Sequence, residues 1–373
     1  MSLVIQEIKT KSEKKLFLTF PNRIYNDNPY WIPPLIFDEL KNLDSNLNPA
    51  FEFCEVKFWM VFKDGKPMGR IAGIINNEYN KLNNTKIVRF GWMDFFEDIE
   101  ICKMLINAVE AWGRSKGMKF IQGPLGLTDF DPEGMLVEGF DQLGTMPSIY
   151  NHPYYPKFIE NLGFQKEADW VEYLLFPPNP PNEKVQRISE VVLKRYNLKI
   201  LKLKKNKDLL AYTNQLFDVL NEAFDGLYGF VPLNQKQKDY VTKQYLGFAN
   251  PEFIPIVLDA NNKVAAFAIT FPSFSEALQK SKGKLFPFGW WYLLKALKKP
   301  KRLDLYLIGV RNDMRDKGLN AILMNEINKV CNKYGINQVE SNYELEDNFK
   351  VQTQWKFYEK QMHKRRRSYI KEI

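Results

Sequence analysis

The chain of 373 residues is poor in the side chains that most often bind metals or form disulfides. It has two histidines, His152 and His363, and three cysteines, Cys54, Cys102 and Cys331, which lie far apart. An odd, dispersed set of cysteines predicts neither a disulfide framework nor a zinc cluster. Two histidines give little basis for metal or triad chemistry. We therefore expect a protein without a bound metal.

Long hydrophobic runs are also missing. No apolar run approaches the ~18 residues that a membrane-spanning helix needs, and residues 1–7 do not form a basic region followed by an apolar stretch. We expect a cytoplasmic protein. Hydrophobic residues make up 45% of the chain, and its length fits about two domains of roughly 150 to 200 residues.

Positive charge is concentrated in the second half. Residues 1–178 hold 19 Lys and Arg against 24 Asp and Glu, whereas residues 179–373 hold 34 against 20. A basic second half suits an anionic partner, such as a coenzyme A phosphate, a tRNA or an acidic lipid surface. Solvated surface lysines explain the same imbalance equally well.

A proline-rich stretch divides the chain. Residues 176–182 read F-P-P-N-P-P-N, which can continue neither a helix nor a sheet, so we predict domains at 1–178 and 179–373. Both halves have a hairpin pattern, a strand, a helix, a second strand, a helix and a last strand. The first hairpin turns at Asp64 and Gly65, and the second at Asn261 and Asn262. This order predicts a mixed α/β fold.

A basic turn stands out in the second half. Residues 310–320 read V-R-N-D-M-R-D-K-G-L-N, directly after an apolar strand pattern and directly before a helical one. A helix start presents free main-chain N–H groups and a positive dipole end, which suit a phosphate or pyrophosphate. The residues that we assign to this site are Val310, Arg311, Arg315, Lys317, Gly318, Asn320 and Ala321.

The spacing R-x-x-G-x-N at residues 315–320 resembles the acyl-coenzyme A pyrophosphate loop of GNAT acetyltransferases, whose usual form is Q/R-x-x-G-x-G/A. The chain as a whole is similar to bacterial tandem GNAT-like proteins of an uncharacterised family. The resemblance rests on the motifs at residues 28–35, 69–72, 123–125, 134–140, 150–155 and 345–348. It implies two tandem GNAT-like acyl-CoA N-acyltransferase domains, with acetyl-CoA or another acyl-CoA as co-substrate and no metal.

The first half departs from this pattern. After its strand at residues 87–93 the chain reads D-F-F-E-D-I-E, with four acids and neither Arg nor Gly, and such a turn repels phosphates. In the Y-x-x-x-G-F ending that often supplies the GNAT general acid, Ile159 takes the tyrosine position. We expect a degenerate first domain that does not bind acyl-CoA.

The loop at residues 123–155 is the candidate acceptor site. Its acids Asp129, Asp131, Glu133 and Glu138 could attract a cationic amine, although acids in turns often only cap and solvate. We assign substrate binding to Asp129, Asp131, Glu138, Tyr150 and Asn151.

Catalytic candidates follow from the GNAT resemblance in the second half. The strand at residues 338–343 should end beside the reacting carbonyl, so Glu340 or Glu344 could deprotonate an ammonium. Tyr358 is the candidate general acid, because Trp355 occupies the position of the usual tyrosine.

Two further segments carry open alternatives. Residues 285–299 mix aromatics with lysines, which suits a lid or interdomain plug, our preference, or a membrane-surface helix. The basic run at residues 364–367 suits a nucleic-acid contact or alternation on a terminal edge strand.

We therefore expect an acyl-CoA-dependent N-acyltransferase that acts on an amine or other small molecule. One alternative is a transferase that uses aminoacyl-tRNA and resembles the Fem proteins. Another is a non-catalytic binding or scaffold protein with the GNAT fold. Nucleic acid is not the expected partner, and the sequence does not indicate an oligomeric state.

Overall fold

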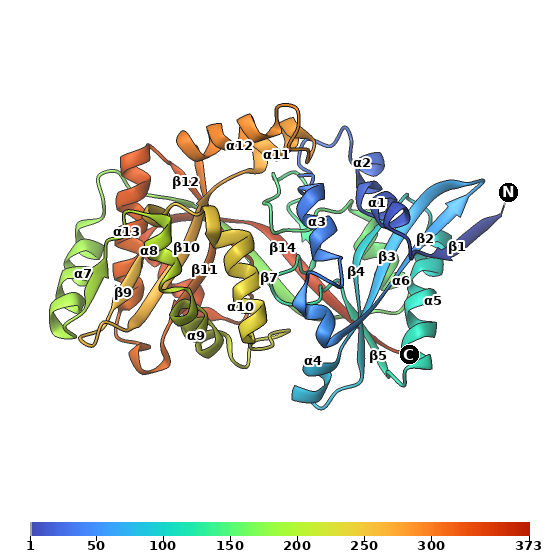
Figure 1. Cartoon of the computed structure of the whole chain (residues 1–373), viewed down its shortest axis with the longest axis horizontal. Helices are drawn as coiled ribbons and strands as arrows, with labels where there is room; N and C mark the ends of the chain where they lie inside the picture. Colours follow the sequence, from blue (N-terminus) through green and yellow to red (C-terminus); the bar gives the residue numbers. More distant parts are fainter. Residues whose placement is uncertain (1) are drawn as a thin grey trace.

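A computed structural model describes residues 2–373. Its strands form one mixed sheet in the order β1-β2-β3-β4-β5-β14-β7-β12-β11-β10-β9-β8, with β6 and β13 attached to β14 and β7. Figure 1 shows the sheet running through the molecule, with helices on both sides of it. The predicted mixed α/β fold class is confirmed.

The elements of the first half are β1 (Leu3–Glu7), α1 (Lys11–Thr19), α2 (Pro21–Ile24), α3 (Ile36–Asn42), η1 (Pro49–Glu52), β2 (Cys54–Lys63), β3 (Lys66–Asn76), α4 (Asn77–Leu82), β4 (Ile87–Phe95), α5 (Ile99–Ser115), β5 (Phe120–Gly123), β6 (Met135–Glu138), α6 (Tyr154–Asn161) and β7 (Gln165–Phe176).

Those of the second half are α7 (Glu183–Arg195), β8 (Lys199–Leu201), α8 (Asn206–Leu210), α9 (Thr213–Phe224), α10 (Gln235–Tyr245), η2 (Leu246–Phe248), η3 (Pro251–Phe253), β9 (Ile256–Leu258), β10 (Val264–Pro272), α11 (Ser275–Ser281), α12 (Gly289–Lys298), β11 (Arg302–Val310), η4 (Asn312–Met314), α13 (Leu319–Tyr334), β12 (Gln338–Ser341), β13 (Glu344–Leu345), α14 (Phe349–Gln352), η5 (Thr353–Phe357) and β14 (Glu359–Glu372).

Local sequence explains the first hairpin and the helix that covers it. Asp64 and Gly65 both have positive φ, at 49° and 74°, as a tight turn between β2 and β3 requires. Helix α5 begins after Asp98, whose carboxylate accepts the N–H of Glu100. Its apolar face, which includes Leu105 and Val109, is buried against the sheet of the first half.

The same arrangement recurs in the two halves. In the first, β4 pairs in parallel with β5 only over residues 87–89 and 120–122, then continues with β3 as its only strand neighbour among the described residues to Phe95 before α5. In the second, β11 pairs in parallel with β12 over residues 302–305 and 338–341, then continues to Val310 before α13. Each half therefore has a pair of parallel strands that separate in front of a helix.

The two halves exchange their last strands. Strand β14 lies between β5 and β7, and β7 lies between β14 and β12, so each last strand is flanked by a strand of the other half. Figure 1 shows β14, in red, crossing from the second half to the C-terminus beside β5. The division at residue 178 stays a prediction, and the sheet is continuous across it.

The seam between β7 and β14 contains the basic run at residues 364–367. Lys364 and Arg366 are buried, and Lys364 lies 2.9 Å from Glu172 of β7, which also pairs with Arg366. Arg367 binds Asp169 at 2.8 Å, and Arg365 pairs with Glu138, Asp169 and Glu346. The edge-strand interpretation of this run is wrong, since β14 lies between β5 and β7. The nucleic-acid interpretation stays untested, but the cations of the run already have carboxylate partners.

The apolar spacing at residues 209–224 is that of one helix, but the structure divides this segment into α8 and α9. Residues 348–359 form only the short α14 and η5, and the last strand starts at Glu359. Within residues 2–373, no helix combines the length and hydropathy that crossing a membrane requires.

Candidate functional site

The end of β11 is the first part of the candidate site. The main-chain N–H of Asn342 donates to the carbonyl of Leu305 at 3.0 Å, and its side-chain amide donates to the carbonyl of Tyr306 at 3.2 Å. Beyond this point β13 pairs with β7 instead of β11. The last residues of β11 therefore have an edge that no strand occupies, directly before the basic turn.

The basic turn leads into α13 through two residues with positive φ, Asp316 at 60° and Gly318 at 82°. Among the described residues, the main-chain N–H groups of Lys317, Gly318, Leu319 and Asn320 have no acceptor. Consecutive free N–H groups at the positive end of a helix dipole form a concave anion site. A pyrophosphate fits this arrangement.

The basic side chains of the turn have different roles. Arg311 binds Asp259 at 2.9 Å, Asp313 at 2.6 Å and the carbonyl of Val264, so it fastens the turn to the β9–β10 hairpin. These contacts give Arg311 a structural role, and its assignment as a cofactor ligand stays a prediction.

Arg315 is exposed and donates to the carbonyls of Glu222 and Ala223 at the end of α9. Lys317 lies over the ring of Tyr196, 5.4 Å from its centre. The N–H of Ala321 is bonded to the carbonyl of Gly318, so Ala321 offers no free donor at the helix start, and Val310 is the last residue of β11. The main-chain N–H of Asn320 has no acceptor among the described residues and can therefore bind a ligand.

The equivalent place in the first half is closed. Asp98 caps α5 with its own carboxylate, which supplies the anion that the helix start favours. The hydroxyl of Tyr155 accepts the N–H of Phe95 at 2.9 Å, and the hydroxyl of Tyr154 donates to its carbonyl at 2.6 Å. The strand end that is open in the second half is therefore saturated here.

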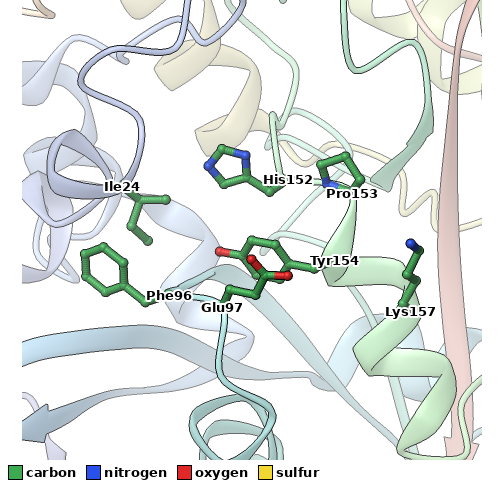
Figure 2. Close-up of a pocket in the computed structure, with 7 residues that line it drawn as sticks. All are labelled: Ile24, Phe96, Glu97, His152, Pro153, Tyr154 and Lys157. Atoms are coloured by element: carbon green, nitrogen blue, oxygen red, sulfur yellow. The ribbon is translucent and has the colours of Figure 1, made fainter.

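A cavity of about 510 Å³ lies outside this closed strand end. Figure 2 shows Phe96, Glu97, His152 and Tyr154 around it, with Lys157 on α6 to one side. Burial lowers the pKa of His152, whose ring stacks on Tyr154 with centres 5.6 Å apart. The cavity offers an acid, a base and aromatic surface, but no anion site.

Glu344 has the environment of a general base. Burial raises its pKa to about 8, although the Trp355 indole N–H, which donates to both carboxylate oxygens at 2.9 and 3.2 Å, opposes the shift. It stands on β13, directly beyond the point where β11 and β12 separate. A carboxylate with a pKa near neutrality can both accept and return a proton.

The other two catalytic candidates are engaged elsewhere. The Tyr358 hydroxyl donates to the carbonyl of Met324 in α13 at 3.0 Å, and burial raises its pKa, so its proton is held by the helix. Glu340 is fully buried and lies 2.7 Å from Lys364 and 2.5 Å from His363. Burial opposes the charge of Glu340, but Lys364 and His363 lower its pKa. Both side chains already have partners in the structure, and their assignment as catalytic stays a prediction.

Glu172, Glu340 and His363 bring three potential metal ligands within reach of one another. The Lys364 ammonium lies 2.9 Å from Glu172 and 2.7 Å from Glu340, so it already supplies the cation that these carboxylates need. The trio is better explained as part of the seam than as a metal centre.

Two acids of the 123–155 loop gather around Arg89. Burial raises the pKa of Asp129 to about 7, opposed by Arg89. Burial, together with Asp129, raises the pKa of Glu133 well above its usual value. One oxygen of each has no hydrogen-bond partner among the described residues. Gly229 of the second half lies against both, and Arg89 donates to its carbonyl at 3.2 Å.

Asp131 lies next to this pair, and burial raises its pKa to about 7 as well. Its carboxylate accepts the N–H of Thr128 at 2.9 Å, which makes it a turn residue. Asp129 and Glu133 remain the pair with unused acceptors at the junction of the halves.

The remaining substrate assignments are structural. Glu138 pairs with Arg365 on the surface, away from the buried acids. The Tyr150 hydroxyl donates to the carbonyl of Phe140, and Asn151 bonds to both the N–H and the carbonyl of Leu136. Sequence reasoning missed Arg89, although a lone arginine inside the apolar strand I-V-R-F-G-W was a sign of a buried charge.

No protein-family model matches the chain. The chain is similar to Protein YghO of Escherichia coli, with 26% identity over 383 aligned positions that cover 99% of this chain and 95% of that protein. It is also similar to the bacterial ceramide synthase of Caulobacter vibrioides, with 26% identity over 362 positions, 93% of this chain and 91% of that protein.

Among solved structures, a tandem GNAT protein from the clavulanic acid biosynthesis pathway superposes with a TM-score of 0.56 and 10% identity, covering 100% of this chain and 98% of that one. At this identity the likeness concerns the fold. The chain has the tandem GNAT fold, as the sequence resemblance implied.

Proposed function

We propose that the protein is an acyl-CoA-dependent N-acyltransferase whose acyl-CoA site lies in the second half only. The observation that carries this proposal is the row of free N–H groups at residues 317–320, beside a strand end with an open edge. The N–H groups hold the pyrophosphate, and Arg315 and Lys317 add positive charge at the same turn. The acyl chain and thioester then follow the open edge of β11 towards Glu344.

The reaction is attack of an amine on the thioester carbonyl carbon. Glu344 takes one proton from the ammonium, which frees the nitrogen lone pair. The C–N bond forms, the C–S bond breaks, and the second proton of the nitrogen passes to the leaving thiolate of coenzyme A. Main-chain N–H groups on the open edge of β11 are the nearest donors for the negative carbonyl oxygen.

The acceptor proposed here is a long-chain amine. A ceramide is an amide of such an amine, and the ceramide synthase of Caulobacter vibrioides resembles this chain over nearly its whole length. Asp129 and Glu133 would accept hydrogen bonds from polar groups of this amine, because each keeps an unused carboxyl oxygen at the junction of the two halves. The aminoacyl-tRNA alternative is less well supported, because the cations at residues 364–367 are buried or paired with carboxylates.

Calorimetric titration with acetyl-CoA and palmitoyl-CoA tests the donor site. Wild type should bind one molecule per chain. Arg315→Glu should abolish the binding, because it places a carboxylate beside the pyrophosphate, whereas Asp98→Lys at the start of α5 should leave it unchanged. Equal affinity in the Arg315→Glu variant would remove the central claim.

The reaction itself is tested by following thiol release from acyl-CoA in the presence of a sphingoid base. The rate should rise with pH through about 8, since Glu344 acts in its ionised form and its pKa is raised to about 8. Glu344→Gln should lower the rate by about 10²- to 10⁴-fold and remove that pH dependence. Donor binding without turnover of any amine would favour the non-catalytic alternative.

A further inference from the structure

Helix α12 and the loop before it expose a run of large apolar side chains. Phe286 is 77% exposed, Phe288 67%, Trp291 48%, Trp290 46% and Leu294 44%, all within nine residues. Figure 1 shows α11 and α12 on the outer rim of the molecule. The aromatics are therefore not the packed part of a lid or plug at residues 285–299, although Leu293, Ala296 and Leu297 of this segment do pack in a core that includes Ile32 of the first half.

The opposite face of α12 anchors the helix. Leu293, Ala296 and Leu297 are partly buried and pack against the core that contains Phe271 and Leu278. The spacing i, i+3, i+4 places these three residues on one side of the helix. Trp291 and Leu294 are exposed away from that side, and Trp290 is exposed at its boundary, one turn of the same stripe from Leu293. The exposed side chains thus stand on a fixed helix rather than on a loose segment.

The charged residues in the segment between Glu276 and Asp304 all have one sign. Between Glu276 and Asp304 the chain has no acid, but it has seven lysines and Arg302; the lysines are Lys280, Lys282, Lys284, Lys295, Lys298, Lys299 and Lys301. Lys295 lies over the ring of Trp291, 5.3 Å from its centre. Lys295 and Lys298 belong to the exposed side of α12.

The first half adds to the same surface. The N–H of Ile36, at the start of α3, donates to the carbonyl of Gly283 at 3.3 Å. The next residue, Phe37, is 58% exposed, and Lys41 lies 3.9 Å from the centre of its ring. We call residues 286–294 together with Phe37 the aromatic face.

We propose that the aromatic face docks on the surface of a bilayer that contains anionic lipids. Tryptophan and phenylalanine on one side of a fixed helix can enter the boundary between headgroups and acyl chains, while the lysine stems let their ammonium groups reach the phosphates. The excess of lysines between residues 277 and 303 complements an anionic leaflet, although Glu276 and Asp38 pair with lysines at its margins. A second copy of the chain fits less well, because two such faces would bring like charges together.

This proposal rests on the exposed face and its charge, not on the acyltransfer. The two can fail separately, since vesicle binding is measured without acyl-CoA. If both hold, docking brings the site towards an acceptor that resides in the membrane.

The test is sedimentation of the full chain with phosphatidylcholine vesicles, with and without phosphatidylglycerol. Wild type should bind the anionic vesicles and bind the neutral ones weakly. Replacing both tryptophans, Trp290→Ala with Trp291→Ala, should weaken binding at least about tenfold while the melting temperature stays within a few degrees, because both side chains are exposed. The triple variant Lys295→Gln, Lys298→Gln and Lys299→Gln should lose the preference for anionic vesicles.

Matched controls come from other parts of the surface. Phe349→Ala removes an aromatic that is 69% exposed on α14, and the triple variant Lys204→Gln, Lys205→Gln and Lys207→Gln removes the same charge near α8. Both should bind vesicles like wild type.

Four results would overturn the proposal. The first is no binding of wild type to anionic vesicles, and the second is full binding by the double tryptophan variant. The third is a large drop in its melting temperature, which would mean that the tryptophans are packed after all. The fourth is a dimer in sedimentation velocity that the double variant dissolves, which would make a second copy the occupant.

Discussion

The N-termini of α5 and α13 lie at equivalent places in the two halves but differ in their hydrogen-bond partners. Both helices follow a strand that has just separated from its parallel neighbour. At α5, Asp98 caps the helix and two tyrosine hydroxyls bind the main chain of Phe95. At α13, Gly318 supplies the turn and four N–H groups are left without acceptors. A fold repeated in one chain can thus keep its backbone while one copy closes the place that the other leaves open.

The largest expected effect concerns the seam that joins the two halves. Glu172→Gln should lower the free energy of unfolding by about 3 to 5 kcal/mol, because Lys364 and Arg366 remain buried with less countercharge. Burial alone would raise the pKa of Glu172, but Arg366 and Lys364 lower it to about 2. The contribution is therefore fully present above about pH 4.5 and lost as the pH falls towards 2.

Urea unfolding at pH 7 measures this effect. The matched control is Glu55→Gln, which breaks the half-exposed pair with Lys116 and should cost less than about 1 kcal/mol. An equal effect in the two variants would mean that the exchanged strands do not depend on this pair.

Each of the two equivalent strands, β11 and β4, contains a buried aspartate. Replacing these aspartates by asparagine should change the stability at pH 8 in opposite directions. Asp304 of β11 is buried with no hydrogen-bond partner for either oxygen among the described residues, and burial, with Glu340 nearby, raises its pKa to about 7. Between about pH 3.8 and 7 this carboxyl ionises in the unfolded chain but stays protonated in the folded one. The free energy of unfolding therefore falls as the pH rises through this range. Asp304→Asn should therefore stabilise the protein at pH 8, by at most ~4 kcal/mol, and change little at pH 4.

Asp94 of β4 is the contrasting case. Burial raises its pKa as well, but Arg70, which lies 2.7 Å away, and the Tyr25 hydroxyl oppose the shift. Asp94→Asn leaves the buried Arg70 guanidinium without its countercharge and should therefore destabilise the protein at pH 8. Thermal unfolding of both variants at pH 4 and pH 8 compares them. A loss of stability in Asp304→Asn at pH 8 would contradict the unpartnered state of that carboxyl.

Local sequence patterns predicted much of the difference between the two helix starts. The Asp64–Gly65 turn, the apolar face of α5 and the basic turn before α13 each depend on residues close in the chain, and the structure contains all three. The acids after β4 also predicted that the first helix start would not suit phosphates, and Asp98 as its cap agrees with that expectation.

Contacts between distant residues were not predictable in this way. Arg366 resembles part of a surface charge run until its partner, Glu172, is known to lie beside it in the sheet. Tyr358 has the residue type of a general acid, but its hydroxyl is bonded to α13. The exchange of β7 and β14 changes every neighbour of these strands without changing any local pattern.

A smaller effect is expected from opening the closed strand end. Tyr155→Phe removes the acceptor of the Phe95 N–H and should lower stability by about 1 to 3 kcal/mol. It should not create a second acyl-CoA site, because Asp98 still caps α5. Tyr358→Phe is the control in the other half. Its partner carbonyl, Met324, sits inside α13 and keeps its helical hydrogen bond, so less than about 1 kcal/mol is expected.

Denaturant unfolding and the stoichiometry of acyl-CoA binding are the two measurements for this pair. Two molecules of acyl-CoA per chain in Tyr155→Phe would show that the tyrosine alone closes the first half.

The smallest effect is expected from replacing the glycines at the two ends of α13. These substitutions distinguish the cost of backbone strain from the loss of a ligand contact. Gly318 precedes the helix with φ at 82°, and Gly335 follows it with φ at 68°. Alanine at either position adopts a disfavoured conformation, so each substitution should cost about 1 kcal/mol of stability. At Gly335 a new Cβ meets no atom within 4 Å, and at Gly318 it meets only the Val192 side chain, at 3.2 Å.

Only Gly318 lies among the N–H groups proposed to hold the pyrophosphate. Gly318→Ala should therefore weaken acyl-CoA binding by about five- to tenfold, which corresponds to about 1 kcal/mol, whereas Gly335→Ala should leave the affinity unchanged. Calorimetry on the two variants makes the comparison at similar strain, so a difference in affinity reports the contact itself. Equal weakening in both would mean that strain in α13, rather than the approach of its first N–H groups to the phosphates, controls binding.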